Sequence, residues 1–360
     1  MGQDGGEYRG VANYKRYLKI YCSYMNIERK KMNILVTGAT GFMGTYLVSR
    51  LIECGHMVRA LVRDEAKARR VLDKSCEIFV GDVEKEETLI GCCENIDVVY
   101  HMAALMGHDS PSPEAFEKFR KVNVYGVTNI IREAKKNNIV KFIHISSTAA
   151  LGLQKIIKVN EETECRPYTP YQVTKREGEL CVLDEFRQSG FPAVVIRPSM
   201  VYGPGFKGDF LTLAKVCKSG WFPKIGRGAN LSPALYITDL VEAMVKLIDK
   251  GKAGEIYMLS SKESYTLSET AEIIGRVLNK KIRFIYVPRN LAIMGAGILE
   301  FICKQLGKRP PVTKRNIQSV STDRIIDISK LSKELEFEPC ISLEIGLPKT
   351  IRYFIEQKYL

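Results

Sequence analysis

The sequence lacks the side-chain patterns of disulfide-stabilised and metal-binding proteins. Its ten cysteines include no Cys-x-x-Cys pair, and Cys92 and Cys93 are adjacent, where a mutual disulfide would be strained. The four histidines lie apart and form no ligand pair of helical spacing: His56, His101, His108 and His144. We therefore expect reduced thiols, as in a cytoplasmic protein, and no structural or catalytic metal.

Long apolar runs are also scarce. The longest one in the body of the chain, Leu291 to Ile302, contains Glu300 and is shorter than the roughly 20 residues that a membrane-spanning helix needs. We expect no membrane span. Because Arg289 and Lys304 flank this stretch, it could lie on a membrane surface as a peripheral contact. The favoured interpretation is a lid helix packed on the core.

Charge of one sign is not concentrated in a nucleic-acid-binding pattern. The net charge is +13, yet the 54 Lys and Arg residues are scattered, without a zinc-finger spacing or an aromatic RNA-binding signature. A positive net charge of this kind suits an anionic small-molecule ligand at least as well as it suits nucleic acid. We expect no nucleic-acid partner. Residues 1–31 lack the apolar region of a signal peptide and precede a start-like Met32, so we expect a loose N-terminal extension.

Short β-branched runs alternate with amphipathic segments from Met32 onward. The pattern predicts strands at 33–37, 57–62, 76–80, 98–102, 141–145, 193–196 and 255–259, and helices at 46–53, 128–136 and 171–188. Strand and helix repetition of this kind predicts an α/β fold, a Rossmann-type doubly wound parallel sheet with helices on both faces.

The pattern changes beyond Val201. Loops rich in Gly and Pro (202–205, 226–228 and 309–311) separate helices predicted at 268–278 and 343–357. We expect residues 32–201 to form the nucleotide-binding domain, which the strand at 255–259 also joins. Residues 202–360 are expected to form mainly a smaller C-terminal lid that binds the substrate.

A glycine-rich turn, Thr37-Gly-Ala-Thr-Gly-Phe-Met-Gly44, follows the first strand. Glycines let the chain turn tightly and bring backbone N–H groups and a helix N-terminus up to a pyrophosphate. Because the turn stands between a strand and a helix, it predicts a dinucleotide cofactor. The residues expected beside the cofactor are Gly38, Thr40, Gly41, Phe42, Met43 and Gly44.

The end of the second strand indicates which cofactor binds. An acid there would bind the ribose hydroxyls of NAD, whereas a base would pair with the extra phosphate of NADP. Val62 occupies the position of the acid, and Arg63 follows it, with Lys67, Arg69 and Arg70 close behind. We predict NADP, with Arg63 and Arg70 at its phosphate. NAD stays open, because a solvated basic turn would have the same sequence.

Tyr171 and Lys175 lie four residues apart, on one face of a predicted helix. A phenol with a pKa of about 10 is a poor base at neutral pH, but a nearby ammonium lowers that pKa. Ser147 follows the strand at 141–145, whose carboxyl end would face the ligand crevice, so its hydroxyl can donate to a substrate oxygen. Ser146 and Thr148 are the alternatives to Ser147.

In combination, these motifs resemble those of the extended short-chain dehydrogenases/reductases. That group includes NAD-dependent epimerases/dehydratases and enzymes like dihydroflavonol reductase and 3β-hydroxysteroid dehydrogenase. The resemblance runs from about Met32 to the C-terminus, on motifs in the right order: the glycine turn, Asp82, His101-Met-Ala-Ala104, Asn123-Val-Tyr-Gly126, Ser147, Tyr171 with Lys175, and Arg197 to Pro204. It implies that Tyr171 is the acid/base and that Lys175 tunes it and binds the nicotinamide ribose. It also implies that Ser147, five residues before Gly152, polarises the carbonyl.

The resemblance implies further contacts with the cofactor. Asp82 and Val83 resemble the pair that contacts adenine, Ala103 and Ala104 line the cofactor, and Pro198 is expected beside it.

Three more expectations follow from the same resemblance. Asn123 is placed near the cofactor as a helix-shaping or proton-relay residue, and His101 is interpreted as a packing residue. A homodimer through two long helices, one containing Tyr171, is the family expectation.

Two positions bear on the substrate. Members of the group that act on nucleotide sugars usually carry an Asn and an Arg where this chain has Met200 and Ser232. Segments 225–231 and 327–335 resemble reductase and sterol-dehydrogenase-like members, although Arg227 could still serve an anionic substrate. We expect hydride transfer at a carbonyl or secondary alcohol of a small, relatively apolar molecule. The alternatives are a nucleotide-sugar epimerase/dehydratase that retains NAD, and a non-catalytic NADP-binding regulator.

Overall fold

The strand order of one sheet defines the fold. The computed structural model describes residues 30–107, 109–154, 156–226, 228, 230–306, 313–314, 317 and 323–360, except the side chain of residue 304. Seven parallel strands run in the order β12-β7-β5-β4-β1-β2-β3. They are β1 (Asn33–Thr37), β2 (Met57–Val62), β3 (Glu77–Val80), β4 (Val98–His101), β5 (Lys141–Ile145), β7 (Ala193–Pro198) and β12 (Ile256–Leu259). The order reverses between β1 and β4, so the predicted Rossmann-type sheet is confirmed.

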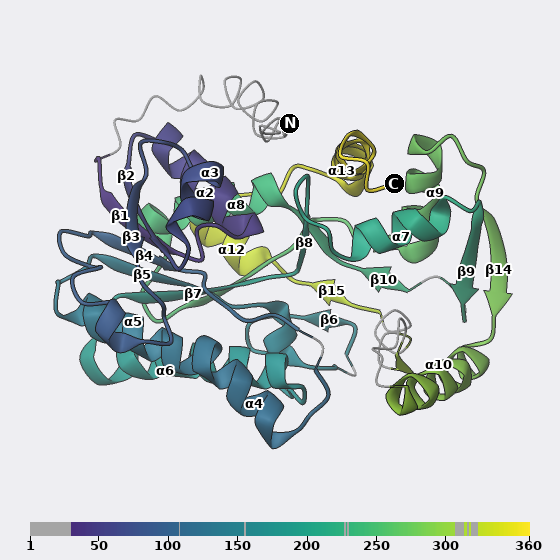
Figure 1. Ribbon diagram of the computed structural model, residues 1–360, viewed down its shortest axis with the longest axis horizontal. Helices are drawn as coiled ribbons and strands as arrows, with labels where there is room; N and C mark the ends of the chain where they lie inside the picture. The colour runs from purple at the N-terminus through teal and green to yellow at the C-terminus, as the bar shows by residue number, and fades with distance from the viewer. Residues whose placement is uncertain are drawn as a thin grey trace.

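Helices cover both faces of this sheet (Figure 1). One face carries α2 (Phe42–Glu53), α3 (Glu65–Val71), α8 (Ile237–Lys250) and α12 (Ser329–Leu335), and the other carries α5 (Gly126–Lys135) and α6 (Pro170–Ser189). Side chains alternate along each strand. In β1, Ile34 and Val36 pack in the core with α2 and α8, whereas Leu35 packs in the core with α5 and α6.

The predicted elements agree with the observed ones to within two residues, apart from one helix start. The helix predicted from Tyr46 begins at Phe42, because Gly41 in the glycine turn is already its N-cap. α6 begins at Pro170, where Thr169 and Gln172 form a capping box, and ends before Gly190, whose φ is 69°. The sequence pattern did not indicate α8.

A smaller layer of elements lies beyond β7, on the right in Figure 1. Three helices pack together in it: α7 (Asp209–Cys217), α9 (Leu267–Val277) and α13 (Leu343–Glu356). β9 (Trp221–Ile225) pairs with β14 (Arg283–Val287), and α10 (Arg289–Gln305) follows β14. Short pairs complete the layer: β8 (Met200–Tyr202) with β11 (Ala234–Tyr236), β10 (Leu231–Ser232) with β13 (Tyr265–Thr266), and β6 (Lys158–Val159) with β15 (Ile325–Ile326).

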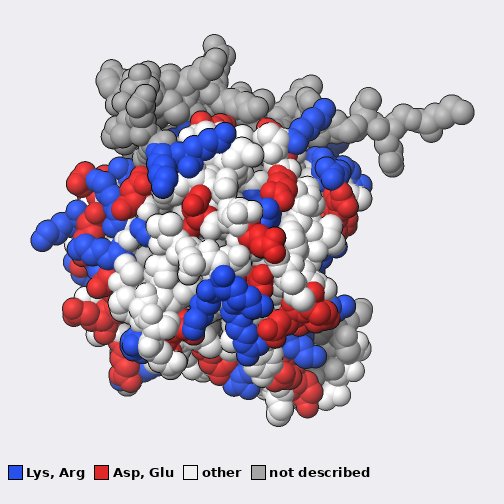
Figure 2. Space-filling model, turned by 90° about the vertical axis from the view of Figure 1, so that its left-hand side faces the viewer, with Lys and Arg blue, Asp and Glu red and all other residues white. Residues whose placement is uncertain are grey.

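Some sequence predictions concern residues outside the described ranges: His108, Arg227, the loop at 309–311 and most of the extension at 1–31. In the part of the chain that the structure describes, no helix is long and apolar enough to cross a membrane, and no disulfide joins two cysteines. On the end of the molecule shown in Figure 2, basic and acidic side chains are interspersed. The scattered charge of the sequence therefore stays mixed on that face.

Candidate active site

At Gly38 and Gly44 of the glycine turn, neighbouring backbone atoms lie so close that a side chain would not fit. Gly38 directly follows β1 with a φ of +68°, and a Cβ atom on it would lie 3.0 Å from the Ala103 nitrogen. A Cβ on Gly44 would lie 2.3 Å from the Gly38 carbonyl oxygen. Gly41 is the N-cap of α2, and no side chain caps the first N–H groups of that helix. An open helix N-terminus behind a side-chain-free turn fits the pyrophosphate of a dinucleotide.

Aromatic contacts tie this turn to the loop after β8. The rings of Phe42 and Phe206 stack with centroids 5.0 Å apart, and the Tyr46 hydroxyl donates to the Pro204 carbonyl at 2.8 Å. Thr40 and Met43, in the same turn, are partly buried. The glycine turn therefore lies at the junction between the sheet and the smaller layer.

Thr37 joins the carboxyl ends of β1 and β4. Its hydroxyl oxygen accepts hydrogen bonds from the backbone nitrogens of Met102 (3.1 Å) and Ala103 (3.0 Å) and lies 3.2 Å from His101 Nδ1. Ala103 is partly exposed and Ala104 exposed, at the open edge of the sheet. The sequence analysis did not identify Thr37, although its position next to the first glycine was a usable signal.

His101 is a buried packing residue in this structure. Its ring stacks on that of His144, with centroids 5.6 Å apart. Burial and the nearby charge of Lys175 lower the pKa of His101 to about 3. The imidazole is therefore neutral at physiological pH and is no general acid there.

Two arginines, Arg63 directly after β2 and Arg70 in α3, have no acidic partner in the described ranges. Arg63 and Arg70 are exposed, and neither forms an ion pair with any residue in the described ranges. Arg69 differs, because its guanidinium pairs with Glu65 at 2.6 Å. Asp64 caps α3 by accepting the Lys67 N–H at 2.9 Å. The one acid next to Arg63 in sequence is thus used by the helix.

Asp82 and Val83 follow β3 at the same edge. The Asp82 carboxylate accepts the Glu84 N–H at 3.1 Å, and the Val83 carbonyl accepts from the Asn129 side chain at 2.9 Å. Gly126 is packed so closely that a Cβ on it would lie 2.9 Å from Val83. The connection after β3 is therefore held in place by α5.

The structure brings the three predicted catalytic side chains together. Tyr171 and Lys175 lie in the first turns of α6, and Ser147 follows β5. The Ser147 side chain lies close enough to the Tyr171 hydroxyl to lower its pKa. The buried Lys175 ammonium donates to the Ile145 carbonyl, two residues before Ser147, at 2.7 Å.

The acidity of Tyr171 differs from the sequence expectation. Burial of the hydroxyl raises the pKa of Tyr171, and the hydrogen bond with Ser147 only opposes that shift. The expectation that Lys175 lowers this pKa is therefore wrong for this structure, because loss of solvent around the phenolate outweighs other effects. Burial lowers the pKa of Lys175 to about 8, against an opposing effect of Glu179.

Glu179 is a buried acid that the sequence analysis missed. Arg197 binds it at two points, and Ser146 donates to it at 2.5 Å and Arg176 at 2.9 Å. Burial by itself would raise the pKa of Glu179, but these hydrogen bonds bring it below its usual value. The signal was available, because Glu179 follows Lys175 by four residues on the same helix face.

Asn123 forms hydrogen bonds that link the loop at Leu105 to α6. It lies in a π-helical turn, Lys121–Tyr125, and its side-chain oxygen accepts the Leu105 N–H at 2.8 Å. Its amide nitrogen donates to the Leu105 carbonyl at 3.1 Å and to the Thr174 hydroxyl at 3.0 Å. These bonds engage both amide protons within the protein, next to Lys175. They support a positioning role for Asn123 rather than direct contact with a cofactor.

The substrate side holds a basic group without an acidic partner. Arg324 donates to the Gly152 carbonyl at 3.2 Å, and burial lowers the pKa of Arg324. It forms no ion pair with a residue of the described ranges. Pro198 is buried at the end of β7, and Met200 and Ser232 are partly buried in β8 and β10.

Comparisons with known proteins agree with this architecture. The sequence profile described as "NAD dependent epimerase/dehydratase family" matches residues 34–260. A 4-hydroxy-2-methyl-3-oxo-4-farnesyl-3,4-dihydroquinoline-1-oxide ketoreductase from Stigmatella aurantiaca is 26% identical over 88% of this chain and 95% of its own length. A UDP-glucose 4-epimerase from Vibrio cholerae is 27% identical over 90% of this chain and 96% of its own length.

A solved structure shows the same fold. The UDP-glucuronic acid 4-epimerase from Bacillus cereus, crystallised in complex with NAD, gives a TM-score of 0.71 at 24% identity and covers 91% of this chain and 100% of its own. The family profile spans more than half of the 360 residues, in the region that holds the glycine turn, Ser147, Tyr171 and Lys175. The chain therefore belongs to the NAD-dependent epimerase/dehydratase family of extended short-chain dehydrogenases/reductases and is an NAD(P)-dependent enzyme.

Proposed function

We propose that this enzyme transfers hydride between NADP and a carbonyl or secondary alcohol carbon of a small, relatively apolar molecule. The observation that carries the proposal is the meeting of Ser147, Tyr171 and Lys175 at the carboxyl edge of the sheet. Ligands of open α/β sheets bind outside this edge. The glycine turn, with its open helix N-terminus, lies at the same edge.

Each of the three side chains has its own role in the proposed reaction. When bound, the nicotinamide cofactor supplies or accepts the hydride. Tyr171 exchanges a proton with the substrate oxygen, and Ser147, whose side chain lies close to the Tyr171 hydroxyl, donates to that same oxygen. Lys175, whose ammonium is held by the Ile145 carbonyl, binds the nicotinamide ribose.

The preference for NADP rests on Arg63 and Arg70, which form no ion pair with a residue of the described ranges. Arg63 is exposed directly after β2, where the extra phosphate of NADP would bind, and Arg70 is exposed in α3, the helix that follows. Other proposed contacts are Gly38, Thr40, Gly41, Phe42, Met43 and Gly44 at the pyrophosphate, Asp82 and Val83 at the adenine, and Ala103, Ala104 and Pro198 along the cofactor. We propose Asn123 as a positioning residue, through Leu105 and Thr174.

An apolar substrate is supported by two side chains and one relative. Met200 is apolar where nucleotide-sugar enzymes usually have an Asn, and Ser232 is uncharged where they usually have an Arg. The named substrate of the Stigmatella ketoreductase carries a farnesyl group. Residues 202–360 are proposed to contribute most of the substrate pocket, and residues 32–201 the cofactor site. A homodimer in the cytoplasm is proposed from the family resemblance and the reduced cysteines.

One observation favours a second candidate, a nucleotide-sugar epimerase or dehydratase that retains NAD. The Arg324 guanidinium lies beside Gly152 without an acidic partner in the described ranges. A buried arginine of this kind is stabilised by an anionic group such as a diphosphate. The UDP-glucose 4-epimerase from Vibrio cholerae is a relative of matching length.

One experiment separates the two candidates. The purified protein is titrated calorimetrically with NADPH and NADH and examined for retained nucleotide by native mass spectrometry. Exchangeable, preferred NADPH binding, followed by its oxidation with a panel of ketones, is the result we expect. Tightly retained NAD, with turnover of nucleotide sugars but not of ketones, would replace the first proposal by the second.

A further inference from the structure

One face of α10 exposes large apolar side chains to solvent. They are 47% to 65% exposed: Leu291, Met294, Ile298, Phe301, Ile302 and, just beyond the helix, Leu306. Their spacing of three to four residues places them on one helix face. Among the described side chains of this helix, only those of the small residues Ala296 and Cys303 are buried. The favoured expectation of a helix packed on the core is therefore wrong for these large side chains.

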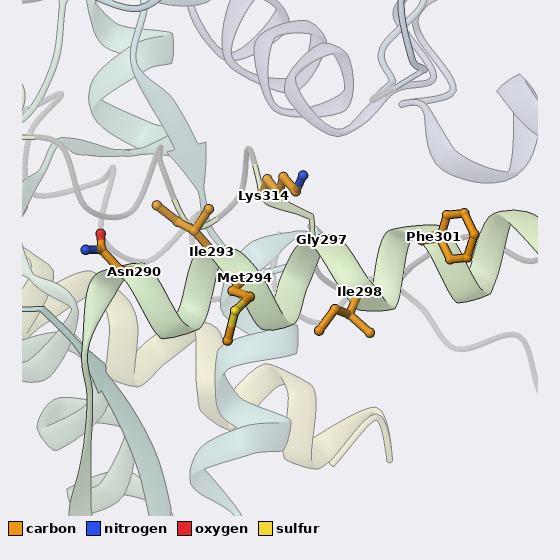
Figure 3. A pocket seen from close by; sticks show the side chains of 7 residues that line it. All are labelled: Asn290, Ile293, Met294, Gly297, Ile298, Phe301 and Lys314. Carbon is orange, nitrogen blue, oxygen red and sulfur yellow. The ribbon is translucent and has the colours of Figure 1, made fainter.

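A groove of about 540 Å³ runs along this helix, and an amine lies at its rim (Figure 3). Ile293, Met294, Ile298 and Phe301 line it, together with Lys314. The Lys314 side chain lies over Gly297, where an added Cβ would come within 2.2 Å of it. The groove thus combines apolar walls with one positive charge, a combination that suits an acyl chain below an anionic headgroup.

The sequence around α10 is strongly basic. Residues 280–315 contain nine Lys or Arg and a single acid, Glu300. The Glu300 carboxylate accepts the backbone N–H of Lys314 at 2.8 Å. The sheet end of the molecule has no such bias, because Figure 2 shows both signs mixed there. Positive charge therefore accompanies a helix whose large apolar side chains face solvent.

The neighbouring strands carry residue types that favour a membrane–water interface. Trp221 and Tyr286, on β9 and β14, are both exposed. The Arg283 guanidinium lies 5.3 Å from the centre of the Trp221 ring. Amphipathic aromatic rings beside basic side chains are typical of segments that lie at lipid headgroups.

We propose that the exposed face of α10 docks on the surface of an anionic lipid bilayer, together with the exposed basic residues Lys280, Lys281, Arg283, Arg289 and Lys314. A second copy of the chain fits less well, because a symmetric contact would bring this basic segment against itself. No helix of the described ranges can span a bilayer, so the contact is peripheral. The proposal does not depend on the cofactor or on the reaction, and a positive result would leave the proposed function to its own test.

The test is sedimentation of the full-length protein with vesicles. Binding to phosphatidylcholine vesicles containing about 30 mol% phosphatidylserine should exceed binding to phosphatidylcholine alone by more than about tenfold. It should also weaken as salt rises from about 0.1 M to about 1 M. The double variant Ile298→Glu/Phe301→Glu should lose about tenfold or more of this binding. The matched control is the double variant Ile90→Glu/Val140→Glu, which places the same two charges on exposed apolar residues beside the sheet and should bind as wild type.

A second measurement covers the case in which the double variant fails to fold. Trp221 is the single tryptophan of the chain, so a Phe301→Trp substitution in a Trp221→Phe background places one reporter on α10. Its emission should shift to the blue on addition of anionic vesicles, whereas Ile90→Trp in the same background should not shift. Equal binding to both kinds of vesicle, or an unshifted Phe301→Trp reporter, would overturn the proposal. It would also be overturned if the double variant turned a dimer into a monomer while vesicle binding stayed unchanged.

Discussion

Arg197 and Glu179 form a two-point ion pair that is almost completely shielded from solvent. Arg197 Nε lies 2.8 Å from Glu179 Oε1, and Nη2 lies 2.7 Å from Oε2. The pair joins β7 to α6, one turn beyond Lys175. It therefore fixes the helix that carries Tyr171 and Lys175 against the sheet.

Breaking this pair should destabilise the protein strongly. We expect Glu179→Gln to lower the free energy of unfolding by about 3–5 kcal/mol, because it leaves the Arg197 charge buried without its partner. Urea unfolding measures the change. Glu177→Gln is the control, since its pair with Arg120 is partly exposed and should contribute less than about 1 kcal/mol. Equal losses of unfolding free energy in the two variants would show that the buried ion pair stabilises the protein no more than the partly exposed one.

Tyr171→Phe should separate cofactor binding from turnover. The substitution removes the proton that the proposed mechanism transfers, so we expect kcat to fall by about 10²- to 10⁴-fold while the Kd for NADPH is unchanged. Tyr168→Phe changes an exposed tyrosine three residues earlier and should leave both constants unaltered. Undiminished turnover in Tyr171→Phe would remove Tyr171 from the mechanism.

Arg63→Ala should change the choice of cofactor. Loss of a charge-assisted hydrogen bond of about 1.5–3 kcal/mol corresponds to a drop of about ten- to a hundredfold in the affinity for NADPH, with little effect on NADH. The ratio of the two Kd values from calorimetry measures this. Lys74→Ala, an exposed basic residue in the turn after α3, is the control. A ratio that does not move would contradict our assignment of NADP.

Lys175 should titrate far below other lysines. Its pKa is lowered to about 8, first by burial, against a usual value of about 10.4. The unfolded chain then binds more protons between about pH 8 and 10.4, so stability should rise with pH across that window. Lysine labelled with ¹³C at Cε should show one NMR resonance that titrates near pH 8 and is missing in Lys175→Met. In that variant the free energy of unfolding should not show this rise between about pH 8 and 10.4.

Gly44→Ala should weaken both the fold and the nucleotide site. The added Cβ would lie 2.3 Å from the Gly38 carbonyl oxygen, which is backbone and can move only with the turn. We expect a loss of about 1–3 kcal/mol in unfolding free energy and weaker NADPH binding. Gly295→Ala, in the exposed part of α10 with no atom close by, should be neutral or stabilising by up to about 1 kcal/mol. Matching losses in the two variants would argue against a special role for the turn.

The local sequence was sufficient to predict the α/β alternation, the parallel sheet and the placement of the glycine turn. Strand and helix periods are properties of short segments, and parallel strands present their carboxyl ends at one edge whatever the details of packing. For the same reason the spacing of Tyr171 and Lys175 identified a shared helix face, and the position of Ser147 after β5 predicted that it would meet them.

Tertiary structure decided what surrounds these residues. The Ser146 and Arg197 contacts with Glu179, and the contact of Asn123 with Leu105 and Thr174, join segments distant in sequence, and no local pattern specifies them. Burial sets the pKa shifts of Tyr171 and Lys175, and burial depends on the whole packed core. The apolar stretch at 291–302 predicted a lid helix whose apolar face packs on the core. That this face points to solvent could come only from the packing of the other elements, because periodicity identifies a face but not what covers it.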